Sequence, residues 1–234
     1  MDKEGFLPVS EIFVSLQGEG AYAGTPSVFL RTYYCNLTCT WCDSKYTWQG
    51  QNSAREGTDY RQMSLDEVLE RLTDSGCRHL VVTGGEPLLH QKQLSSLFPR
   101  LEKLGFFIEV ETNGTIAPSA ETAGPVGCFN VSPKMSNSLV PAAARVHGAA
   151  LKAFVESGKA YFKFVVCQPG DVAEIEELIS AHGLPRDRVI LMPEGTDAGT
   201  LAARGRWLAE VCRQRGFRLS PRLHILLFGN KRGT

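Results

Sequence analysis

The fold is decided by the stretch Ser27-Val-Phe-Leu-Arg-Thr-Tyr33, which is followed after one residue by Cys35-Asn-Leu-Thr-Cys39-Thr-Trp-Cys42. The first part is a short run of apolar, β-branched and aromatic residues, which is typical of a buried strand. The second part places three cysteines directly after that strand. Reactive side chains at the carboxyl end of a strand are typical of α/β enzymes built on parallel strands.

Similar apolar runs predict further strands at 79–83, 106–111, 128–132, 161–166, 189–192 and 222–228. Helical patterns lie between several of them: one begins at Ser64, with Glu67 at capping-box spacing, and others cover 91–104, 171–183 and 201–215. This alternation predicts an α/β fold of parallel strands covered by helices. Because fewer than eight βα units are visible, we expect a partial (incomplete) TIM-like βα barrel, organised as one domain over residues 1–234.

The overall composition excludes several classes of protein. The 25 Lys and Arg residues balance the 25 Asp and Glu residues, so no basic surplus points to nucleic acid or to an anionic membrane as a partner. The first residues are polar and acidic, without the apolar segment of a secretion signal, and no apolar run is long enough to span a bilayer. We therefore expect a cytoplasmic protein with no nucleic-acid or membrane partner.

The cysteine pattern indicates a metal centre. Seven cysteines is an odd number, and three of them fall within eight positions, whereas Cys77, Cys128, Cys167 and Cys212 are scattered among apolar residues as buried thiols would be. Three thiolates can hold three irons of a [4Fe–4S] cluster and leave the fourth iron open for a ligand. Two alternatives fit less well: structural zinc normally needs four ligands, and an electron-transfer ferredoxin normally supplies a fourth cysteine.

The spacing Cys35-x-x-x-Cys39-x-x-Cys42, together with Gly84-Gly85-Glu86-Pro87 after a predicted strand, resembles the radical S-adenosylmethionine (SAM) superfamily. In that superfamily the open iron binds the amino and carboxylate groups of SAM, and the GGEP segment contacts the SAM amino group. Glycines at such a segment permit close approach of the backbone. The resemblance therefore implies a [4Fe–4S] cluster and SAM as cofactors.

Further segments resemble one family, the 7-carboxy-7-deazaguanine synthases. They are 11–20, 24–26, 29–31, 42–44, 111–115 and 132–134, and the likeness runs from about Ser10 to the C-terminus, with weak stretches at 49–63 and 142–159. It implies conversion of 6-carboxy-5,6,7,8-tetrahydropterin to 7-carboxy-7-deazaguanine with loss of ammonia, on the route to queuosine. In the course proposed for the family, a 5′-deoxyadenosyl radical takes a hydrogen from the substrate and later returns it, so SAM is used catalytically.

The family pattern also implies roles for individual residues, none of them catalytic beyond holding the cofactors. Ser44 matches the ligand of a Mg²⁺ ion, although Thr is commoner at that position. The residues that match substrate contacts are Leu16, Gln17, Gly18, Arg31 and Thr83. Those that match SAM contacts are Trp41, Cys42, Asp43, Gly85, Ser132, Pro133, Lys134, Cys167 and Gln168, with Glu111 and Asn113 as further ribose or substrate contacts.

The resemblance further implies an electron donor of flavodoxin or ferredoxin type and a homodimer. It does not settle the C-terminal tail, which is longer than in family members that close it over the substrate. His224 either faces the substrate or is a core histidine. The segment 49–63 is either a lid or a surface loop.

Two other functions are compatible with the cysteines alone. A glycyl-radical-enzyme activase shares CxxxCxxC and GGEP, but it has no need for Arg31, Ser44 or the loop at 16–19. A non-catalytic iron–sulfur redox or sensor protein would leave GGEP and Ser132–Lys134 unexplained.

Overall fold

The computed structural model describes residues 5–50, 57 and 59–234. One sheet runs through this part of the chain, in the order β3-β1-β2-β4-β5-β6-β7-β8-β9. Its strands are β1 (Phe6–Leu16), β2 (Pro26–Thr32), β3 (Arg61–Ser64), β4 (His79–Gly84), β5 (Phe107–Thr112), β6 (Cys128–Val131), β7 (Ala160–Val166), β8 (Val189–Pro193) and β9 (Arg218–Leu219). Neighbouring strands are parallel along the whole run β2-β4-β5-β6-β7-β8-β9. The strand β1 is antiparallel to both of its neighbours, β2 and β3.

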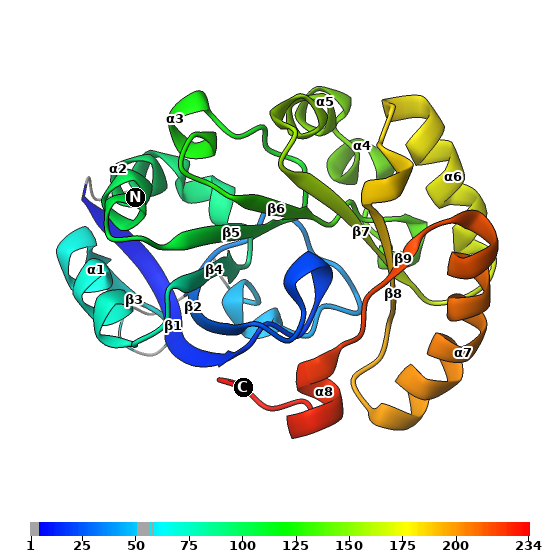
Figure 1. Ribbon diagram of the computed structural model, residues 1–234, viewed down its shortest axis with the longest axis horizontal. Helices are drawn as coiled ribbons and strands as arrows, with labels where there is room; N and C mark the ends of the chain where they lie inside the picture. The colour runs from blue at the N-terminus through cyan, green and yellow to red at the C-terminus, as the bar shows by residue number, and fades with distance from the viewer. Residues whose placement is uncertain (1–4, 51–56, 58) are drawn as a thin grey trace.

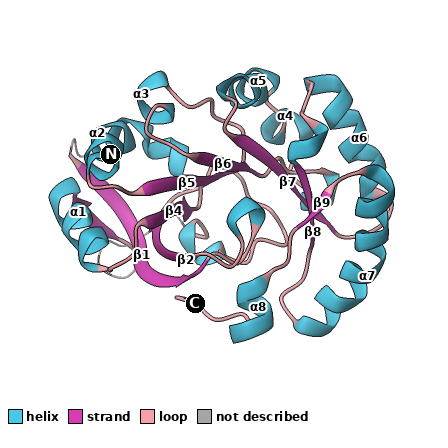
Figure 2. Ribbon diagram, viewed as in Figure 1, coloured by secondary structure: helices cyan, strands magenta, loops and turns pink. Residues whose placement is uncertain are grey.

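The sheet curves into an arc that does not close, with α1 to α7 along its outer side and α8 beside the C-terminus at its opening (Figures 1 and 2). The helices are α1 (Leu65–Asp74), α2 (Gln91–Lys103), α3 (Ala120–Ala123), α4 (Ala142–Arg145), α5 (Gly148–Ser157), α6 (Asp171–His182), α7 (Ala198–Arg215) and α8 (Leu223–Phe228). The predicted incomplete α/β barrel is confirmed. The single domain over residues 1–234 stays a prediction, with which this one continuous sheet agrees.

The helix boundaries follow the local signals in the sequence. The Ser64 side chain accepts from the Glu67 backbone N–H (3.2 Å) and begins α1, as predicted. The Glu67 carboxylate does not complete the capping box, because it pairs with Arg61 and Arg71 instead. Gly183 and Gly216 end α6 and α7 in the left-handed conformation, which glycine adopts without strain.

The strand predicted at 222–228 is wrong, because these residues form α8. A short apolar run carries no period that separates a strand from a helical turn, and Ile225 is the only apolar residue of the run that is deeply buried. The last strand of the sheet is instead the two-residue β9. The strands β1 and β3 were not predicted, although β1 supplies the only antiparallel partner of β2 among the described residues.

Alternation along the strands separates the core from the interior of the arc. Residues such as Leu30, Val82 and Val110 point outward into the main hydrophobic cluster, which the helices cover. Many residues of opposite parity are polar and point inward: Arg31, Thr83, Glu109, Glu111, Asn130 and Lys163. The inner side of the arc therefore carries polar groups beside apolar ones such as Phe29 and Val165, and it is open at the carboxyl ends of the parallel strands. Among the described residues, no helix has both the length and the apolar character needed to cross a membrane.

Candidate active site

Two adjoining cavities lie at the carboxyl ends of the strands. The first, the cluster cavity, has a volume of about 880 Å³ with its open mouth and is lined by all three clustered cysteines. The second, the outer cavity, has a volume of about 1110 Å³ and lies toward β1 and the C-terminal tail. They share the side chains Glu19, Asp43, Ser44, Thr83 and Glu111. A molecule in one cavity therefore lies next to a molecule in the other.

Cys35, Cys39 and Cys42 meet in the wall of the cluster cavity, as the sequence predicts. Cys39 is buried, and Leu37 and Val140 pack around the three thiols. Burial raises the pKa of the Cys35 thiol to about 12 and also raises the pKa of Cys39. Iron must then displace the thiol protons, as metals do when they bind cysteine. Three soft sulfur ligands around one open cavity fit a [4Fe–4S] cluster that keeps one iron free.

The GGEP segment and the cysteine loop are in direct backbone contact. Tyr34 has a positive φ of 79°, and its carbonyl oxygen accepts from the Glu86 N–H (2.8 Å). A Cβ atom at Gly85 would lie 2.0 Å from that carbonyl oxygen. Glycine is therefore required at position 85 by the packing of two loops, in addition to any contact with a cofactor.

Glu86 joins this segment to the end of β5. Its carboxylate is fully buried and accepts from the Asn113 N–H (2.7 Å), the Leu88 N–H (3.0 Å) and the Thr112 hydroxyl (2.8 Å). Burial raises the pKa of Glu86, and these hydrogen bonds act against the rise. Asn113 in turn donates to Asn36 in the cysteine loop (2.8 Å). Sequence reasoning did not assign this role to Glu86, although its place in GGEP is the signal.

Most residues predicted to contact SAM line the cluster cavity: Trp41, Cys42, Asp43, Gly85, Ser132 and Lys134. The Lys134 ammonium donates to the Ser132 hydroxyl (2.9 Å) and lies 5.5 Å from the centre of the Trp41 ring. Pro133 is buried between its neighbours and does not line the cavity. Cys167 and Gln168 do not line it either; their backbone N–H groups donate to Asp171 Oδ2 (2.7 and 3.2 Å) at the first residue of α6.

All the residues predicted to contact the substrate line the outer cavity, and Thr83 also faces the cluster cavity. The Gln17 amide is buried and donates to Glu109 (2.8 Å) and Glu111 (3.1 Å). The Thr83 hydroxyl donates to the other oxygen of Glu111 (2.8 Å). Leu16, Gly18 and Arg31 complete this group. The carboxylates of Glu109 and Glu111 on β5 thus hold the polar groups of the cavity in fixed orientations.

Comparison with known proteins identifies the relatives of this arrangement. Residues 29–197 match the radical SAM superfamily. The 7-carboxy-7-deazaguanine synthases of Pyrobaculum aerophilum and Halobacterium salinarum are 42 % and 38 % identical to the chain, covering 96 % of it in each case and 96 % and 91 % of those proteins. The chain belongs to the 7-carboxy-7-deazaguanine synthase family.

Solved structures agree with this assignment. The crystal structure of QueE from Escherichia coli, at 31 % identity, superimposes with a TM-score of 0.71 and covers 92 % of this chain and 93 % of that one. Streptococcus suis SuiB, at 15 % identity and a TM-score of 0.54, covers 82 % of this chain and 47 % of its own and shares the fold alone. Membership of a 7-carboxy-7-deazaguanine synthase family implies a [4Fe–4S] cluster and SAM as cofactors, which the cluster cavity fits.

This member of the synthase family holds a charged network between the two cavities. Glu19 accepts from Arg222 Nε (2.9 Å) and pairs with Lys163, and Arg222 also pairs with Asp43. Burial acts to raise the pKa of Glu19, but Lys163 and Arg222 hold it well below its usual range. Sequence reasoning missed Lys163 and Arg222. The inward parity of β7 is the signal that could have indicated Lys163.

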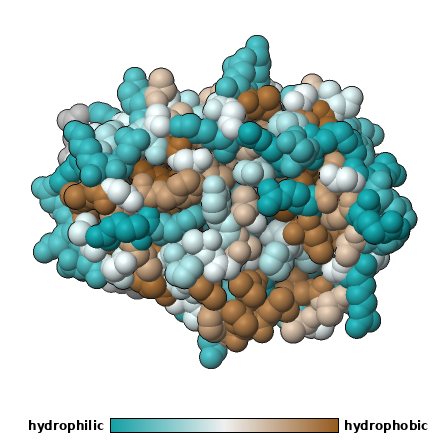
Figure 3. Space-filling model, viewed as in Figure 1, coloured by the Kyte–Doolittle hydropathy of each residue, from teal (hydrophilic) through white to brown (hydrophobic). Residues whose placement is uncertain are grey.

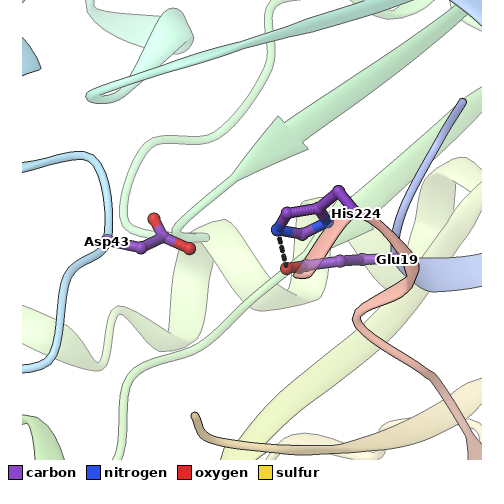
Figure 4. A group of neighbouring side chains, drawn as sticks. All are labelled: Glu19, Asp43 and His224. Atoms are coloured by element: carbon purple, nitrogen blue, oxygen red, sulfur yellow. Dashed lines mark ion pairs between the residues drawn. The ribbon is translucent and has the colours of Figure 1, made fainter. Parts of the chain in front are cut away.

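His224 approaches the same network from α8. Its Nε2 lies 3.9 Å from Glu19 Oε1, with Asp43 opposite (Figure 4). Burial lowers the pKa of His224, so the ring is neutral at pH 7. Three such side chains could bind a cation, but Lys163 and Arg222 already neutralise the two carboxylates. The structure thus places His224 in the wall of the outer cavity, on a helix rather than on a core strand.

The C-terminal tail also reaches the outer cavity of this family member. Residues 230–234 line it, and Arg232 Nε pairs with Glu11 Oε2 (3.1 Å). The Arg232 guanidinium stacks 4.4 Å above the centre of the Tyr46 ring. The tail residues, for which the sequence predicted no role, are therefore part of the cavity wall. Seven residues of the unassigned 49–63 segment, 51–56 and 58, lie outside the described residues.

Proposed function

We propose that the chain converts 6-carboxy-5,6,7,8-tetrahydropterin to 7-carboxy-7-deazaguanine with loss of ammonia, in queuosine biosynthesis, and that it regenerates SAM in each turnover. The observation that carries this proposal is the shared wall of the two cavities: a three-cysteine site on one side adjoins a polar site with an arginine on the other. Family membership supplies the reaction, and the adjoining cavities supply room for SAM and a pterin side by side.

The cofactors would be held by the residues of the cluster cavity. Cys35, Cys39 and Cys42 would bind the cluster, and when bound, the reduced cluster with SAM supplies hydrogen-abstracting radical chemistry. Lys134 is placed to meet the SAM carboxylate, and Trp41 offers an apolar face beside it. Asp43, Gly85, Ser132 and Pro133 are proposed SAM contacts by the family pattern. Cys167 and Gln168 are kept as such only through the resemblance, since they line neither cavity.

The substrate would bind in the outer cavity. Arg31 would pair with the pterin carboxylate through a charge-assisted hydrogen bond, which its position in the lining of this cavity supports. Gln17, with Leu16 and Gly18 beside it, and Thr83 would read the polar edge of the ring, because Glu109 and Glu111 fix the Gln17 amide and the Thr83 hydroxyl. The tail and His224 would limit the access of water to the reacting ring.

We propose Mg²⁺ as a further cofactor, bound through the Ser44 hydroxyl. Ser44 lines both cavities, so an ion on it would meet the substrate in one cavity beside SAM in the other. A hard cation such as Mg²⁺ accepts a hydroxyl oxygen together with substrate oxygens and water. Its role there would be to orient the substrate carboxylate and to balance its charge.

The partners are also proposals. The enzyme would receive its electron from a small donor of flavodoxin or ferredoxin type and would work in the reducing cytoplasm, which suits the free thiols of the described cysteines. A homodimer is supported by an exposed apolar patch on α8, formed by Leu226, Leu227 and Phe228, which Figure 3 shows at the lower edge of the molecule. Its mass in solution, measured by light scattering, tests this assembly.

Activity after anaerobic reconstitution tests the function. The cluster-loaded, reduced protein is given SAM, Mg²⁺ and the carboxytetrahydropterin, and 7-carboxy-7-deazaguanine is the expected product. Formation of 5′-deoxyadenosine without that product would indicate a different radical SAM substrate, such as the protein partner of an activase. Failure to cleave or use SAM at all would indicate a non-catalytic iron–sulfur protein.

A further inference from the structure

One cluster cysteine has an unusual hydrogen-bond partner. The Trp48 indole N–H donates to Cys42 Sγ (3.3 Å), and the Ser44 hydroxyl lies 3.7 Å from the same sulfur. Trp41 lines the same cavity, but its indole N–H donates to the Asn137 carbonyl oxygen (3.1 Å). Two tryptophans of one cavity wall thus differ in the acceptor of a single N–H group.

The position of Trp48 is fixed by a tight turn that returns the chain to the cysteine loop. Thr47 is fully buried, and its N–H (2.9 Å) and hydroxyl (2.8 Å) both donate to the Ser44 carbonyl oxygen. The Tyr34 N–H donates to the Thr47 carbonyl oxygen (2.8 Å). This bond comes from a residue with φ of 79°, a conformation that costs energy for a tyrosine. These hydrogen bonds connect the segment before Trp48 to the residues that flank the cysteine loop, and they hold Trp48 next to Cys42.

An N–H group that donates to a cysteine sulfur stabilises negative charge on that sulfur. The hydrogen bond is stronger when the sulfur is more negative, because hydrogen bonds to a charged acceptor are stronger than those between neutral groups. On a cluster ligand, the reduced state carries one more electron than the oxidised state, so the bond stabilises the reduced state more. Hydrogen bonds to the sulfurs are one of the means by which proteins set the potential of iron–sulfur clusters.

We propose that Trp48 is a positioning residue that raises the reduction potential of the cluster through its hydrogen bond to Cys42. It thereby eases the transfer of one electron from an external low-potential donor. The inference rests on the proposed function only in requiring the cluster on Cys35, Cys39 and Cys42. It assigns Trp48 no contact with SAM or with the pterin.

The test measures the cluster itself, without SAM or substrate. Wild-type protein, Trp48→Phe and Trp41→Phe are reconstituted anaerobically, their iron content is determined, and the midpoint potential is followed by EPR in a mediated dithionite titration. We expect Trp48→Phe to lower the midpoint potential by up to about 59 mV, which corresponds to a tenfold change in the equilibrium constant of a one-electron reduction. Trp41→Phe is the matched control and should keep the wild-type value, because the Trp41 N–H does not meet a sulfur.

A second measurement identifies the proton directly. ENDOR spectra of the reduced wild-type cluster, recorded in H₂O and D₂O, should contain an exchangeable proton coupling that Trp48→Phe lacks and Trp41→Phe retains. Trp48→His, which keeps a ring N–H, should move the potential back toward the wild-type value.

Trp48→Phe with full iron content and an unchanged potential would overturn the proposal. If that variant takes up no iron, Trp41→Phe protein with ¹⁵N-labelled tryptophan indole decides, because the Leu37 N–H also meets a cluster sulfur, and absence of a coupling to the labelled nitrogen would overturn it. Failure of the proposed function is distinct, because a missing deazaguanine product leaves the potential and the ENDOR spectra of the cluster unaffected.

Discussion

Glu11 on β1 and Arg31 on β2 are direct neighbours in the antiparallel register, and their side chains form an ion pair with Arg31 Nε 2.7 Å from Glu11 Oε1. The pair lies in the wall region of the outer cavity, where Arg232 reaches the other Glu11 oxygen. Glu11 therefore fixes the guanidinium in one orientation through Nε and leaves its terminal nitrogens for a second carboxylate, which is the geometry that a carboxylated substrate requires.

Replacement of Arg31 tests this arrangement. We expect Arg31→Lys to raise the KM for the carboxytetrahydropterin by about 10- to 100-fold, because a charge-assisted hydrogen bond contributes about 1.5–3 kcal/mol. Lysine keeps the charge but loses the fork of donors that Glu11 orients. Steady-state kinetics at saturating SAM measure the effect. Arg61→Lys, on an exposed arginine away from both cavities, is the control, and equal KM values for the two variants would contradict the assignment.

Replacement of Ser44 tests the Mg²⁺ site. Ser44→Ala should abolish the response of the rate to added Mg²⁺, because the proposed ligand oxygen is lost. Ser44→Thr keeps a hydroxyl and should keep the response. Rates are compared over a range of Mg²⁺ concentrations after treatment with a chelator. A Ser44→Ala enzyme with the wild-type response would refute the site.

Replacement of Gly85 tests the packing between GGEP and the cysteine loop. A Cβ at this position would lie 2.0 Å from the Tyr34 carbonyl oxygen, and this neighbour is backbone that cannot rotate away. Gly85→Ala should therefore destabilise the chain by about 1–3 kcal/mol, the cost of overpacking, and reduce cluster uptake. Urea unfolding of the apoprotein and iron analysis measure both effects.

Gly205→Ala is the matched control for that substitution. Gly205 lies within α7, and a Cβ there would meet no atom within 4 Å. The same chemical change should stabilise the chain by up to about 1 kcal/mol, because alanine favours a helix interior over glycine. If both variants were stabilised, the loop contact at position 85 would not be required.

The network around Glu19 predicts a pH dependence of stability. The pKa of Glu19 is held well below the ordinary value of 4.5. The ionised carboxylate therefore stabilises the folded state fully at pH values above 4.5, and this contribution is lost as the pH falls below 4.5. The free energy of unfolding of the apoprotein should therefore drop steeply below about pH 4.5 in the wild type and less steeply in Glu19→Gln. At pH 7 the variant should be less stable by about 3–5 kcal/mol, because Lys163 and Arg222 lose a buried partner.

Urea unfolding at a series of pH values measures these differences. Glu121→Gln serves as a control, since Glu121 is a fully exposed carboxyl at the start of α3. Parallel pH profiles for wild type and Glu19→Gln would show that Glu19 is not the group that carries the acid dependence.

The sequence predicted the cysteine loop and the GGEP segment better than the charged network around Glu19. The three cysteines lie within eight positions of one loop, and GGEP follows a short apolar run that is typical of a buried strand, so local patterns sufficed to place both. Lys163 and Arg222 reach Glu19 from more than a hundred residues away, and no local pattern encodes such a contact. The error at 222–228 has a different origin, because a short apolar run does not distinguish a strand from the helical turns of α8.

The role of Cys167 and Gln168 was likewise not resolved by local pattern. Both follow a strand, as the other site residues do, but their backbone N–H groups donate to the Asp171 carboxylate, which holds the loop against the start of α6. A position after a strand is thus compatible with either a ligand contact or a hydrogen bond that only shapes the loop. The arrangement of the loop decides between them, and that arrangement depends on the tertiary structure.

The last five residues of the chain form part of the wall of the outer cavity, with Arg232 anchored on Glu11. Anything joined to Thr234 would therefore continue directly from the place where a pterin is proposed to bind. An affinity tag or a fluorescent fusion at the C-terminus would act on this enzyme as a modification of its binding site. For kinetic measurements, a tag at the C-terminus is therefore expected to change the binding of the substrate.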